Sequence, residues 1–564
     1  MPSCLLVGAA PRPPPAALRL LLRRQMASSG GARAFQLRLN PLTGDSEWLV
    51  IDEAEDAPAA PTHHKQLLAA TSYLDMLNDA ARNRAYRRAI DATVTDPNSR
   101  VLDIGAGTGL LSMMAARALA AVGGEGRGTV SACEAYLPMG KLTRRVLRAN
   151  GMENKVKLFH KRSDELTVGV ELDSRADILV SEILDSELLG EGLIPTLQHA
   201  HDELLVKNLK TVPYRATTYG VLVESTFLWK MHDLHSSEAT AQDGVWLTPR
   251  GTENILSVKL QQHAMQCDAL EDEIRLMSER SSPTCIVADD SVFLALVVSS
   301  LSPSSKVIAM LPGLRDKGFN YLQAVTDANN LSMDRIKVIG RKASSLTMSD
   351  LEHEKVNLIV GEPFYHGSEG MLPWQNLRFW NERTLLESLL SEDVFIMPCK
   401  GILRICAMSL PDLWRSRCSL KDVEGFDHSV VNDSFGACGD MPGEQQGPCL
   451  PYYVWQSGYT KKLSKVYSLM DFDFSEPIHP CFGKTKIKFA YDGICHGFAV
   501  WIDWVLDNKS STVISTGPES RYWKQGVQLL SRPVQVNPSN SSMHVEAHFD
   551  PDTAELSFQA KFVM

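Results

Sequence analysis

The stretch VLDIGAGTG, residues 101–109, decides how this sequence folds. It reads as an apolar strand that runs into three glycines, and a helical pattern follows directly after it. Strands and helices alternate around it, with strands expected at 100–104, 129–133, 155–160 and 178–181 and helices at 110–121 and 139–150. This alternation predicts a parallel, doubly wound α/β sheet whose ligand lies at the carboxyl ends of the strands.

The same order of elements occurs twice, at 99–195 and at 281–373. NGMENKVKLF (150–159) is matched by NNLSMDRIKVI (329–339), and ADILVSEILDSELLGEGLIP (176–195) by VNLIVGEPFYHGSEGMLPW (356–374). The counterpart of the glycine loop, CIVADDSVF (285–293), contains no glycine. Glycine lets the backbone approach a ligand closely, so we expect the first copy alone to hold a nucleoside cofactor.

Bulk composition limits the classes of protein that fit. With 564 residues the chain is expected to form about three to four domains. A net charge of −10 argues against a general nucleic-acid binder and is compatible with cationic, Arg- or Lys-rich protein segments as partners. The 11 cysteines form no CxxC pair, which indicates neither a zinc site nor a disulfide framework and favours a reducing compartment. No apolar run approaches the ~20 residues of a membrane helix.

Five segments are expected along the chain. Residues 1–34 are Arg-rich and free of acidic residues, and we interpret them as a disordered leader, with an organelle transit peptide or a true start at Met26 as alternatives. A strand pair (35–53) and one helix (71–90) precede the first sheet. The expected units are an α/β unit at 35–210, a short β segment at 211–280, a second α/β unit at 281–409 and a long β unit at 410–564.

Two features suggest which cofactor the first copy takes. Glu134 follows the second strand, in the same βαβ unit as the glycine loop, where a carboxylate could bind both ribose hydroxyls. No P-loop lysine follows the glycines, so the pattern favours an adenosyl ligand without a triphosphate, either S-adenosylmethionine or NAD. The alternative reading of Glu134 is an ordinary exposed acid at a strand end.

An acidic loop follows the fourth strand of the first copy. SEILDSELLGEGLIP (181–195) places Glu182 at the strand end and Glu191 nine residues later, with Asp185 and Glu187 between them. Carboxylates beside an apolar run are costly to desolvate unless a cation lies among them, and a guanidinium fits two carboxylates bidentately. The alternative is a solvated charged loop.

Together these motifs resemble the protein arginine N-methyltransferases. The helix with Tyr73 and Met76, VLDIGAGTG, CEA (133–135) and the SE-x8-E loop stand in that family's order. The resemblance implies tandem Rossmann-like S-adenosylmethionine methyltransferase domains, each followed by a β-barrel-type domain. It also implies transfer of one methyl group to an arginine guanidino nitrogen of protein substrates, and a location in the cytoplasm and nucleus.

The resemblance assigns roles residue by residue. Arg82 would pair with the methionyl carboxylate of the cofactor, Glu134 would hold the ribose, and Glu182 and Glu191 would clamp the substrate arginine. No metal is implied. The other positions are placed in the cofactor pocket or beside the substrate: Asp103, Gly105, Gly107, Ser163 and Asp164 at the cofactor, and Tyr73, Met76 and Asp185 at the substrate.

The second copy lacks most of these cofactor- and substrate-binding residues. Leu311 stands where Glu134 would be, Asp289 and Ser291 replace glycines, and Glu362 and Glu369 are only seven residues apart. We therefore expect the second copy to be a scaffold that replaces the second subunit of a dimer, which makes the chain a pseudo-dimer.

The β segment after the first copy is shorter than the one after the second. SRYWKQGVQLL (520–530), which includes Trp523, resembles the family's barrel loop over the substrate arginine. We counted the residues from Glu362 to Trp523 and looked the same number of residues after Glu182. That position already lies inside the second α/β unit. The first copy therefore has no such loop, and its barrel is expected to be truncated near 273–279. Two hypotheses follow: an active arginine methyltransferase, or an impaired form that binds cofactor or partners. A small-molecule methyltransferase is a third.

Overall fold

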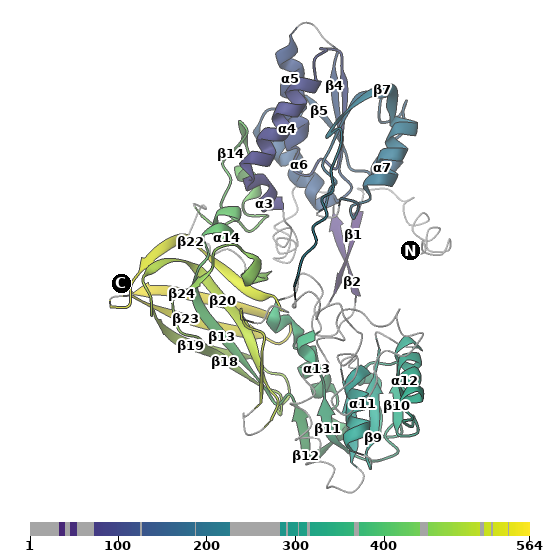
Figure 1. Ribbon diagram of the computed structural model, residues 1–564, viewed down its shortest axis with the longest axis vertical. Helices are drawn as coiled ribbons and strands as arrows, with labels where there is room; N and C mark the ends of the chain where they lie inside the picture. The colour runs from purple at the N-terminus through teal and green to yellow at the C-terminus, as the bar shows by residue number, and fades with distance from the viewer. Residues whose placement is uncertain are drawn as a thin grey trace.

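The computed structural model consists of two α/β units at opposite ends of the molecule and a β-rich unit beside them (Figure 1). The described residues are 33–39, 46–52, 73–123, 127–185, 188–225, 283–288, 292–302, 304–312, 316–365, 372–439, 449–507, 512–519, 523–539 and 541–563.

The N-terminal part confirms the strand pair but not the single helix. Strands β1 (Arg33–Leu39) and β2 (Ser46–Asp52) pair antiparallel. The helix expected at 71–90 is instead two helices, α3 (Tyr73–Asn78) and α4 (Ala80–Thr93). The break is at Asp79, whose carboxylate accepts the backbone N–H of Arg82 at 3.0 Å. Aspartate is a favoured N-cap residue, so it starts a new helix there.

The first sheet is parallel, with strand order β5-β4-β3-β6-β7, which confirms the predicted architecture. Its strands are β3 (Arg100–Ile104), β4 (Thr129–Cys133), β5 (Val156–Phe159), β6 (Ala176–Ser181) and β7 (Leu205–Val212). Its helices are α5 (Leu110–Val122), α6 (Leu137–Ala149) and α7 (Leu193–His199), with short turns η1 (Ser163–Glu165) and η2 (Ala200–Leu204). The boundary suggested at 210/211 falls inside β7.

The second sheet repeats this strand order as β10-β9-β8-β11-β12. Its elements are β8 (Thr284–Val287), α11 (Val292–Leu301), β9 (Lys306–Met310), α12 (Asp316–Ala328), β10 (Ile336–Ile339), η4 (Ala343–Ser345), β11 (Val356–Val360), η5 (Pro363–Tyr365), η6 (Pro373–Asn376), α13 (Arg378–Leu385), η7 (Glu387–Leu389) and β12 (Leu390–Met397). The register of the repeat is fixed by a shared hydrogen bond. The N–H of Arg100 reaches the Asp177 carboxylate at 2.9 Å, and the N–H of Thr284 reaches the Asn357 side chain at 3.1 Å.

The described part of the β-rich unit contains two antiparallel sheets of three or more strands. One is built on β16-β22-β20-β13-β17, with β18 beside β13 and β21 beside β20, and the other is β19-β23-β24. The strands are β13 (Lys400–Ser409), β16 (Leu450–Tyr452), β17 (Lys461–Lys462), β18 (Tyr467–Asp473), β19 (Cys481–Lys488), β20 (Gly493–Val505), β21 (Val513–Ser515), β22 (Gln525–Val536), β23 (Ser542–Asp550) and β24 (Glu555–Val563). Because β13 belongs to this unit, the boundary suggested at 409/410 falls after its first strand.

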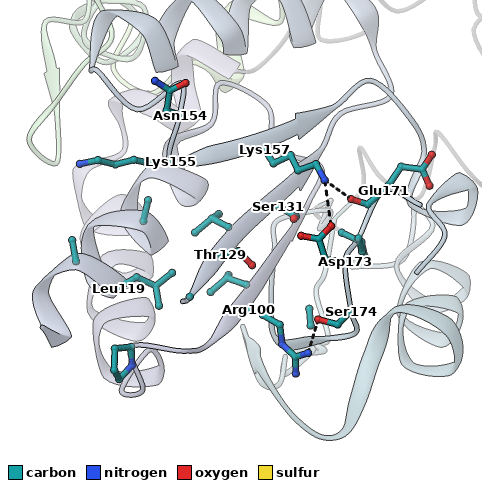
Figure 2. Close-up of a pocket in the computed structure, with 18 of the residues that line it drawn as sticks. Arg100, Leu119, Thr129, Ser131, Asn154, Lys155, Lys157, Glu171, Asp173 and Ser174 are labelled. Carbon is teal, nitrogen blue, oxygen red and sulfur yellow. Dashed lines mark hydrogen bonds and ion pairs between the residues drawn. The ribbon is translucent and has the colours of Figure 1, made fainter. Parts of the chain in front are cut away.

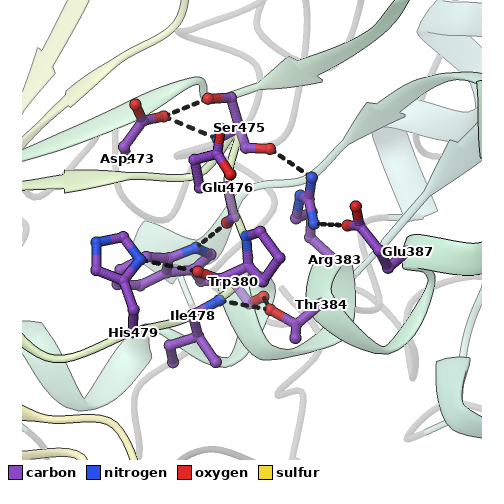
Figure 3. Close-up of polar contacts among 10 residues, drawn as sticks. Trp380, Arg383, Thr384, Glu387, Asp473, Ser475, Glu476, Ile478 and His479 are labelled. Atoms are coloured by element: carbon purple, nitrogen blue, oxygen red, sulfur yellow. Dashed lines mark hydrogen bonds and ion pairs between the residues drawn. The ribbon is translucent and has the colours of Figure 1, made fainter. Parts of the chain in front are cut away.

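The second α/β unit and the β-rich unit are joined through α13 (Figure 3). The indole N–H of Trp380 donates to the Glu476 carbonyl at 2.7 Å, and the buried Arg383 guanidinium donates to the Ser475 carbonyl. One apolar cluster includes residues of β8, of α13 and of the β-rich sheets. These two units therefore share a core.

A segment of the β-rich unit packs on the first α/β unit instead. We call residues 411–438 the docking segment; it contains α14 (Pro411–Ser416), β14 (Asp422–Val423), β15 (Phe426–Asp427) and η8 (Ser429–Val431). Six of its apolar side chains are buried in the same cluster as residues of α4, α5 and α6: Leu420, Val423, Phe426, Val431, Phe435 and Ala437. The core of the first α/β unit is thus completed by residues far away in the sequence.

The chain that leaves the first α/β unit differs from the expectation. The stretch RATTYGVLVEST (215–226) was expected to be β, but its described residues, 215–225, form no strand. Its apolar side chains are exposed, as is that of Tyr214 before it: Tyr219, Val221, Leu222 and Val223. A strand needs a partner strand for its backbone groups, and the described residues provide none here. The rest of the short β segment, including 253–262 and 273–279, lies outside the described residues. Among the helices that are described, none combines the length and apolarity required to span a bilayer.

Candidate active site

The glycine loop bends sharply between β3 and α5. Gly105, Gly107 and Gly109 have φ angles of 77°, 55° and 82°, which L side chains rarely adopt. The N–H groups of Gly105 and Ala106 both donate to the Cys133 carbonyl, at 3.1 and 3.0 Å. The loop is therefore held against the end of β4, with bare backbone facing the carboxyl edge of the sheet.

Glu134, directly after β4, is tied to this loop. One carboxylate oxygen accepts the N–H of Gly107 at 3.0 Å and the other accepts the N–H of Tyr136 at 2.8 Å. Burial raises the pKa of Glu134, although these backbone hydrogen bonds oppose the shift. The carboxylate is held in one orientation, and each oxygen keeps a lone pair for a ligand hydroxyl.

Asp103, within β3, is fully buried beneath the loop. The Ser112 hydroxyl donates to its Oδ2 at 2.5 Å, while Oδ1 has no hydrogen-bond partner among the described residues. Burial raises the pKa of Asp103 to about 7. Ser112 is a supporting residue that sequence reasoning missed, because a serine within a helix carries no distinguishing signal.

Tyr73 connects the two halves of the site. A Cβ placed on Gly107 would lie 3.4 Å from the Tyr73 ring, so helix α3 covers the loop. The pKa of Tyr73 is raised to about 12, first by burial and then by the carboxylates Glu134, Glu191 and Glu182. The acid of the glycine-loop side and both acids of the acidic loop are thus near one phenol ring. Met76, one turn further on α3, is half-buried.

Arg82 and Glu182 form an ion pair of 2.9 Å. The two side chains are 21% and 19% exposed, so each charge is partly removed from water. Burial raises the pKa of Glu182, Arg82 opposes the shift and Glu191 adds to it. Glu182 therefore already binds a guanidinium in this structure, and that guanidinium belongs to the residue predicted to hold the cofactor carboxylate.

The rest of the acidic loop is shaped by Asp185. Its carboxylate lies against Gly190, where a Cβ would approach Oδ2 to 1.8 Å, and its carbonyl accepts the N–H of Leu188 at 3.0 Å. Glu191 follows at an exposed position, whereas Glu187 lies outside the described residues. Asp185 thus packs on the backbone of the loop that carries Glu191.

Ser163 and Asp164 lie in η1, after β5, at the same edge of the sheet. Arg162 donates to Asp164 at 3.0 and 3.1 Å, and this hydrogen bonding lowers the pKa of Asp164. All predicted site residues of the first copy lie on α3, on α4 or at the carboxyl ends of β3, β4, β5 and β6. Positive-φ glycines, a fixed buried carboxylate and an unpartnered Asp103 oxygen fit an adenosyl cofactor.

The second α/β unit has lost these features. The Leu311 N–H bonds the Ile339 carbonyl at 2.9 Å as the Glu134 N–H bonds that of Phe159 at 3.0 Å, so Leu311 does occupy the ribose-acid position. Glu362, the counterpart of Glu182, is retained and buried after β11, and two residues later the Phe364 carbonyl accepts the Trp523 indole N–H at 2.8 Å. Asp289, Ser291 and Glu369 lie outside the described residues.

Two residues of the docking segment reach the cofactor edge of the first unit, and sequence reasoning missed both. Phe435 stacks on Tyr73, with ring centroids 5.8 Å apart and planes at 9°. The buried His428 places Nε2 at 3.3 Å from the Thr108 hydroxyl and Nδ1 at 3.2 Å from the Phe426 carbonyl. The contacts with Tyr73 and Thr108 join positions far apart in the chain, which no local pattern can show.

A cavity of about 460 Å³ lies at the opposite, amino edge of the first sheet (Figure 2). Arg100, Thr129 and Lys155 line it, together with Lys157, whose amine donates to the Glu171 carbonyl at 2.9 Å. None of the predicted site residues lines this cavity, so it is separate from the cofactor edge. No group of three or more potential metal ligands occurs among the described residues.

Comparison with known proteins gives the family. No family model matches the chain. Protein arginine N-methyltransferase 7 from Oryza sativa subsp. indica is 60% identical over 687 aligned positions, covering 94% of this chain and 95% of the rice protein. Protein arginine N-methyltransferase 1.6 from Arabidopsis thaliana is 42% identical, covering 93% and 94%. The chain belongs to the protein arginine N-methyltransferase family.

The cofactor of this protein arginine N-methyltransferase fold is S-adenosylmethionine, and the first α/β unit carries the residues that fit it. Among solved structures, the Trypanosoma brucei PRMT1 enzyme–prozyme heterotetrameric complex with AdoHcy is 14% identical, with a TM-score of 0.39, covering 53% of this chain and 95% of that one. The rice alignment is longer than the 564 residues of this chain. More than a hundred of its positions therefore have no residue here.

Proposed function

We propose that this chain transfers a methyl group from S-adenosylmethionine to a guanidino nitrogen of arginine in proteins and that the product is monomethylarginine. One observation carries the proposal: the glycine loop is hydrogen-bonded to Glu134 on one side and packs on Ile183, the neighbour of Glu182, on the other, where a Cβ on Gly105 would lie 2.9 Å from the Ile183 side chain. The cofactor site and a pair of guanidinium-binding carboxylates thus meet at one edge of the sheet. The net charge of −10 is compatible with Arg-rich, basic protein segments as substrates.

The chemistry requires charge compensation more than a base. The cofactor supplies an electrophilic methyl group on a positively charged sulfur, and the substrate guanidinium is also a cation. Glu182 and Glu191 offset this repulsion and favour lone-pair density on one terminal nitrogen. Because the arginine pKa lies above ~12, its proton leaves during or after the transfer, and positioning contributes most of the rate.

The Arg82–Glu182 ion pair supports a way in which this clamp exchanges one guanidinium for another. Arg82 is a guanidinium that Glu182 already accepts at 2.9 Å. A substrate arginine would replace it, and Arg82 would then be free to pair with the methionyl carboxylate. This exchange would keep the buried Glu182 charge compensated before and after substrate binding, which matters because an uncompensated buried carboxylate is costly.

We further propose that the second half acts as the partner subunit of a pseudo-dimer. The docking segment supports this, because Phe435 and His428 contact the cofactor edge of the first unit while the second unit has Leu311 in place of an acid.

The alternative function, a catalytically impaired form that binds cofactor or partners, rests on a separate observation. Residues 214–225 are exposed and form no strand, and the rice relative has more than a hundred positions without a counterpart here. The family's barrel loop over the substrate arginine is resembled only by the sequence around Trp523. The Trp523 indole donates a hydrogen bond to the Phe364 carbonyl, which belongs to the second half of the chain.

An assay with tritiated S-adenosylmethionine separates the two. Label should enter an Arg-rich peptide but not its Lys-for-Arg counterpart, amino-acid analysis should find monomethylarginine, and Glu191→Gln should lose the activity. Binding of S-adenosylhomocysteine without any label transfer would support the impaired form. The comparison is a chain with a complete first barrel grafted after Glu279. The difference between the two methylation rates measures what the truncated part of the first barrel contributes to activity.

A further inference from the structure

One sheet of the β-rich unit carries three lysines at alternate positions of a single strand. Strands β19, β23 and β24 form a three-stranded antiparallel sheet beside the C-terminus (Figure 1). Alternate residues, such as Ile487, Met543 and Phe549, are buried in the core. The residues between them point to the opposite face, because successive side chains of a strand alternate.

That opposite face carries a row of lysines. We define the cationic sheet face by six of the side chains that the strand register places on it: Phe482, Lys484, Lys486, Lys488, His548 and Lys561. The same register adds His544 beside Lys486 and three acids, Glu546, Asp550 and Glu555, of which the last two stand at the hairpin end of the face, close to His548. All four lysines are exposed. Lys484 pairs with Glu546 at 2.5 Å, whereas Lys486 and Lys488 form neither a hydrogen bond nor an ion pair through their amines with any described residue. Positive charge is therefore concentrated at the end of this face that holds Lys486, Lys488 and Lys561, away from Asp550 and Glu555, although the chain as a whole carries −10.

Aromatic rings lie at one end of the lysine row. The Phe482 ring is 75% exposed, and its centroid is 4.5 Å from that of His548 on the neighbouring strand. These residues border a surface hollow of about 450 Å³, together with Ser557 and Gln559 of β24. Because Phe482 is exposed and lies beside a second ring, its aromatic face is accessible for stacking on a planar group of a ligand.

We propose that the cationic sheet face binds single-stranded nucleic acid. Bases would stack on Phe482 and His548, and phosphates would meet Lys486, Lys488 and Lys561. Single strands are commonly bound in this way, by aromatic side chains that stack on bases and cations that follow the backbone. Lysines at alternate positions of a strand stand about 6.8 Å apart, which gives an extended backbone a regular row of charges. An acidic peptide would match the lysines but leaves the exposed rings unexplained.

The overall negative charge, which argued against a general nucleic-acid binder, here sharpens the proposal. The chain as a whole carries an excess of acidic residues, which disfavours nonspecific binding of a polyanion, so a measurable affinity requires a local site such as this face. A duplex would hide its bases from Phe482, so a single strand is the expected form.

Fluorescence anisotropy with a labelled 12-nucleotide oligouridine and the full chain tests this. Phe482→Ala should weaken binding between about fivefold and a hundredfold, the range seen for loss of one base-stacking ring. Lys486→Gln/Lys488→Gln should weaken it at least about tenfold at low salt and make the salt dependence shallower, because fewer counterions are released. The matched control, Lys207→Gln/Lys337→Gln, removes two exposed lysines elsewhere and should bind like the unmodified chain.

The outcomes are decisive in either direction. All substitutions are at exposed positions, and an unchanged unfolding temperature verifies that each variant is folded. No binding by the unmodified chain, or equal binding by control and Lys486/Lys488 variants, would overturn the proposal. So would an oligoglutamate of similar length that competes fully while Phe482→Ala has no effect, because the partner would then be an acidic protein segment.

Discussion

The two α/β units have the same strand order, but they carry different residues at the carboxyl ends of their strands. Where the first unit has Asp103 and Glu134, the second has Val287 and Leu311, both fully buried. The framework persisted because it needs only apolar strands and helices, which both units retain. The cofactor site depends on a few polar side chains at strand ends, and these can be lost without loss of the fold.

The largest expected effect is on catalysis. Glu182→Gln removes one charge of the guanidinium clamp and should lower the methylation rate about 10²–10³-fold, with cofactor affinity nearly unchanged. The matched change in the second unit, Glu362→Gln, should leave the rate within about twofold. Initial rates with tritiated cofactor measure both. Similar losses in the two variants would break the comparison between an active and an inactive unit.

Cofactor binding should be confined to one unit. Calorimetric titration with S-adenosylhomocysteine is expected to give a stoichiometry near one per chain. Glu134→Ala should weaken binding at least about tenfold, since both the ribose contact and the hydrogen bond to Gly107 are lost. Leu311→Met, a volume-conserving change at the equivalent position, serves as the control and should bind normally. A stoichiometry near two would show that the second unit also binds cofactor.

Loss of the contact between the docking segment and the first α/β unit should affect the order and the cofactor binding of that unit alone. Phe435→Ala removes the ring that stacks on Tyr73 and should cost about 3–5 kcal/mol of packing free energy. We expect faster hydrogen exchange in α3 and at least about tenfold weaker cofactor binding. Phe319→Ala, at an exposed site of α12, is the control. Unchanged exchange in α3 would mean that the docking segment does not hold this helix.

The smallest effect expected is on pH dependence. Burial lowers the pKa of His428, while Asp427 and Asp422 oppose this shift, so the docked ring is neutral. Its Nδ1–H then donates to Phe426, and Nε2 accepts from Thr108. Because the undocked ring has the higher pKa, the docked form loses stability as pH falls below about 6.5 and is insensitive above it.

Cofactor affinity measured between pH 5.5 and 8 tests this behaviour. His428→Gln keeps an amide in place of the imidazole and should flatten the part of the profile below pH 6.5. The same acid-side loss in both proteins would assign the effect to other groups.

The sequence was most informative where the pattern was local. Strands Arg100–Ile104 and Thr129–Cys133 match the expected bounds because short apolar runs are bordered by turn residues. The break at Asp79 was missed because the apolar spacing continues through it, and only the cap bond to Arg82 reveals it.

The candidate site could be predicted as a set of residues but not as an arrangement. Strand ends of one parallel sheet meet at one edge, which is why Glu134 and Glu182 could be grouped from the sequence. The Arg82–Glu182 pair and the Phe435–Tyr73 stack depend on tertiary packing, and no spacing rule encodes them. The β expectation for RATTYGVLVEST failed over its described residues, 215–225, because a strand forms only where a neighbouring strand pairs with it.

The position of the docking segment late in the chain delays completion of the first α/β unit during translation. Helix α3 emerges from the ribosome early, but the side chain that covers it, Phe435, is made only after the second α/β unit has been synthesised. At about 5–20 residues per second, that interval is roughly 20 to 70 seconds. During this time the nascent first unit has an uncovered apolar surface and an incomplete cofactor edge. We therefore expect a nascent chain to bind the cofactor tightly only after the docking segment has been synthesised, and chains interrupted before it to gain no stability from the ligand.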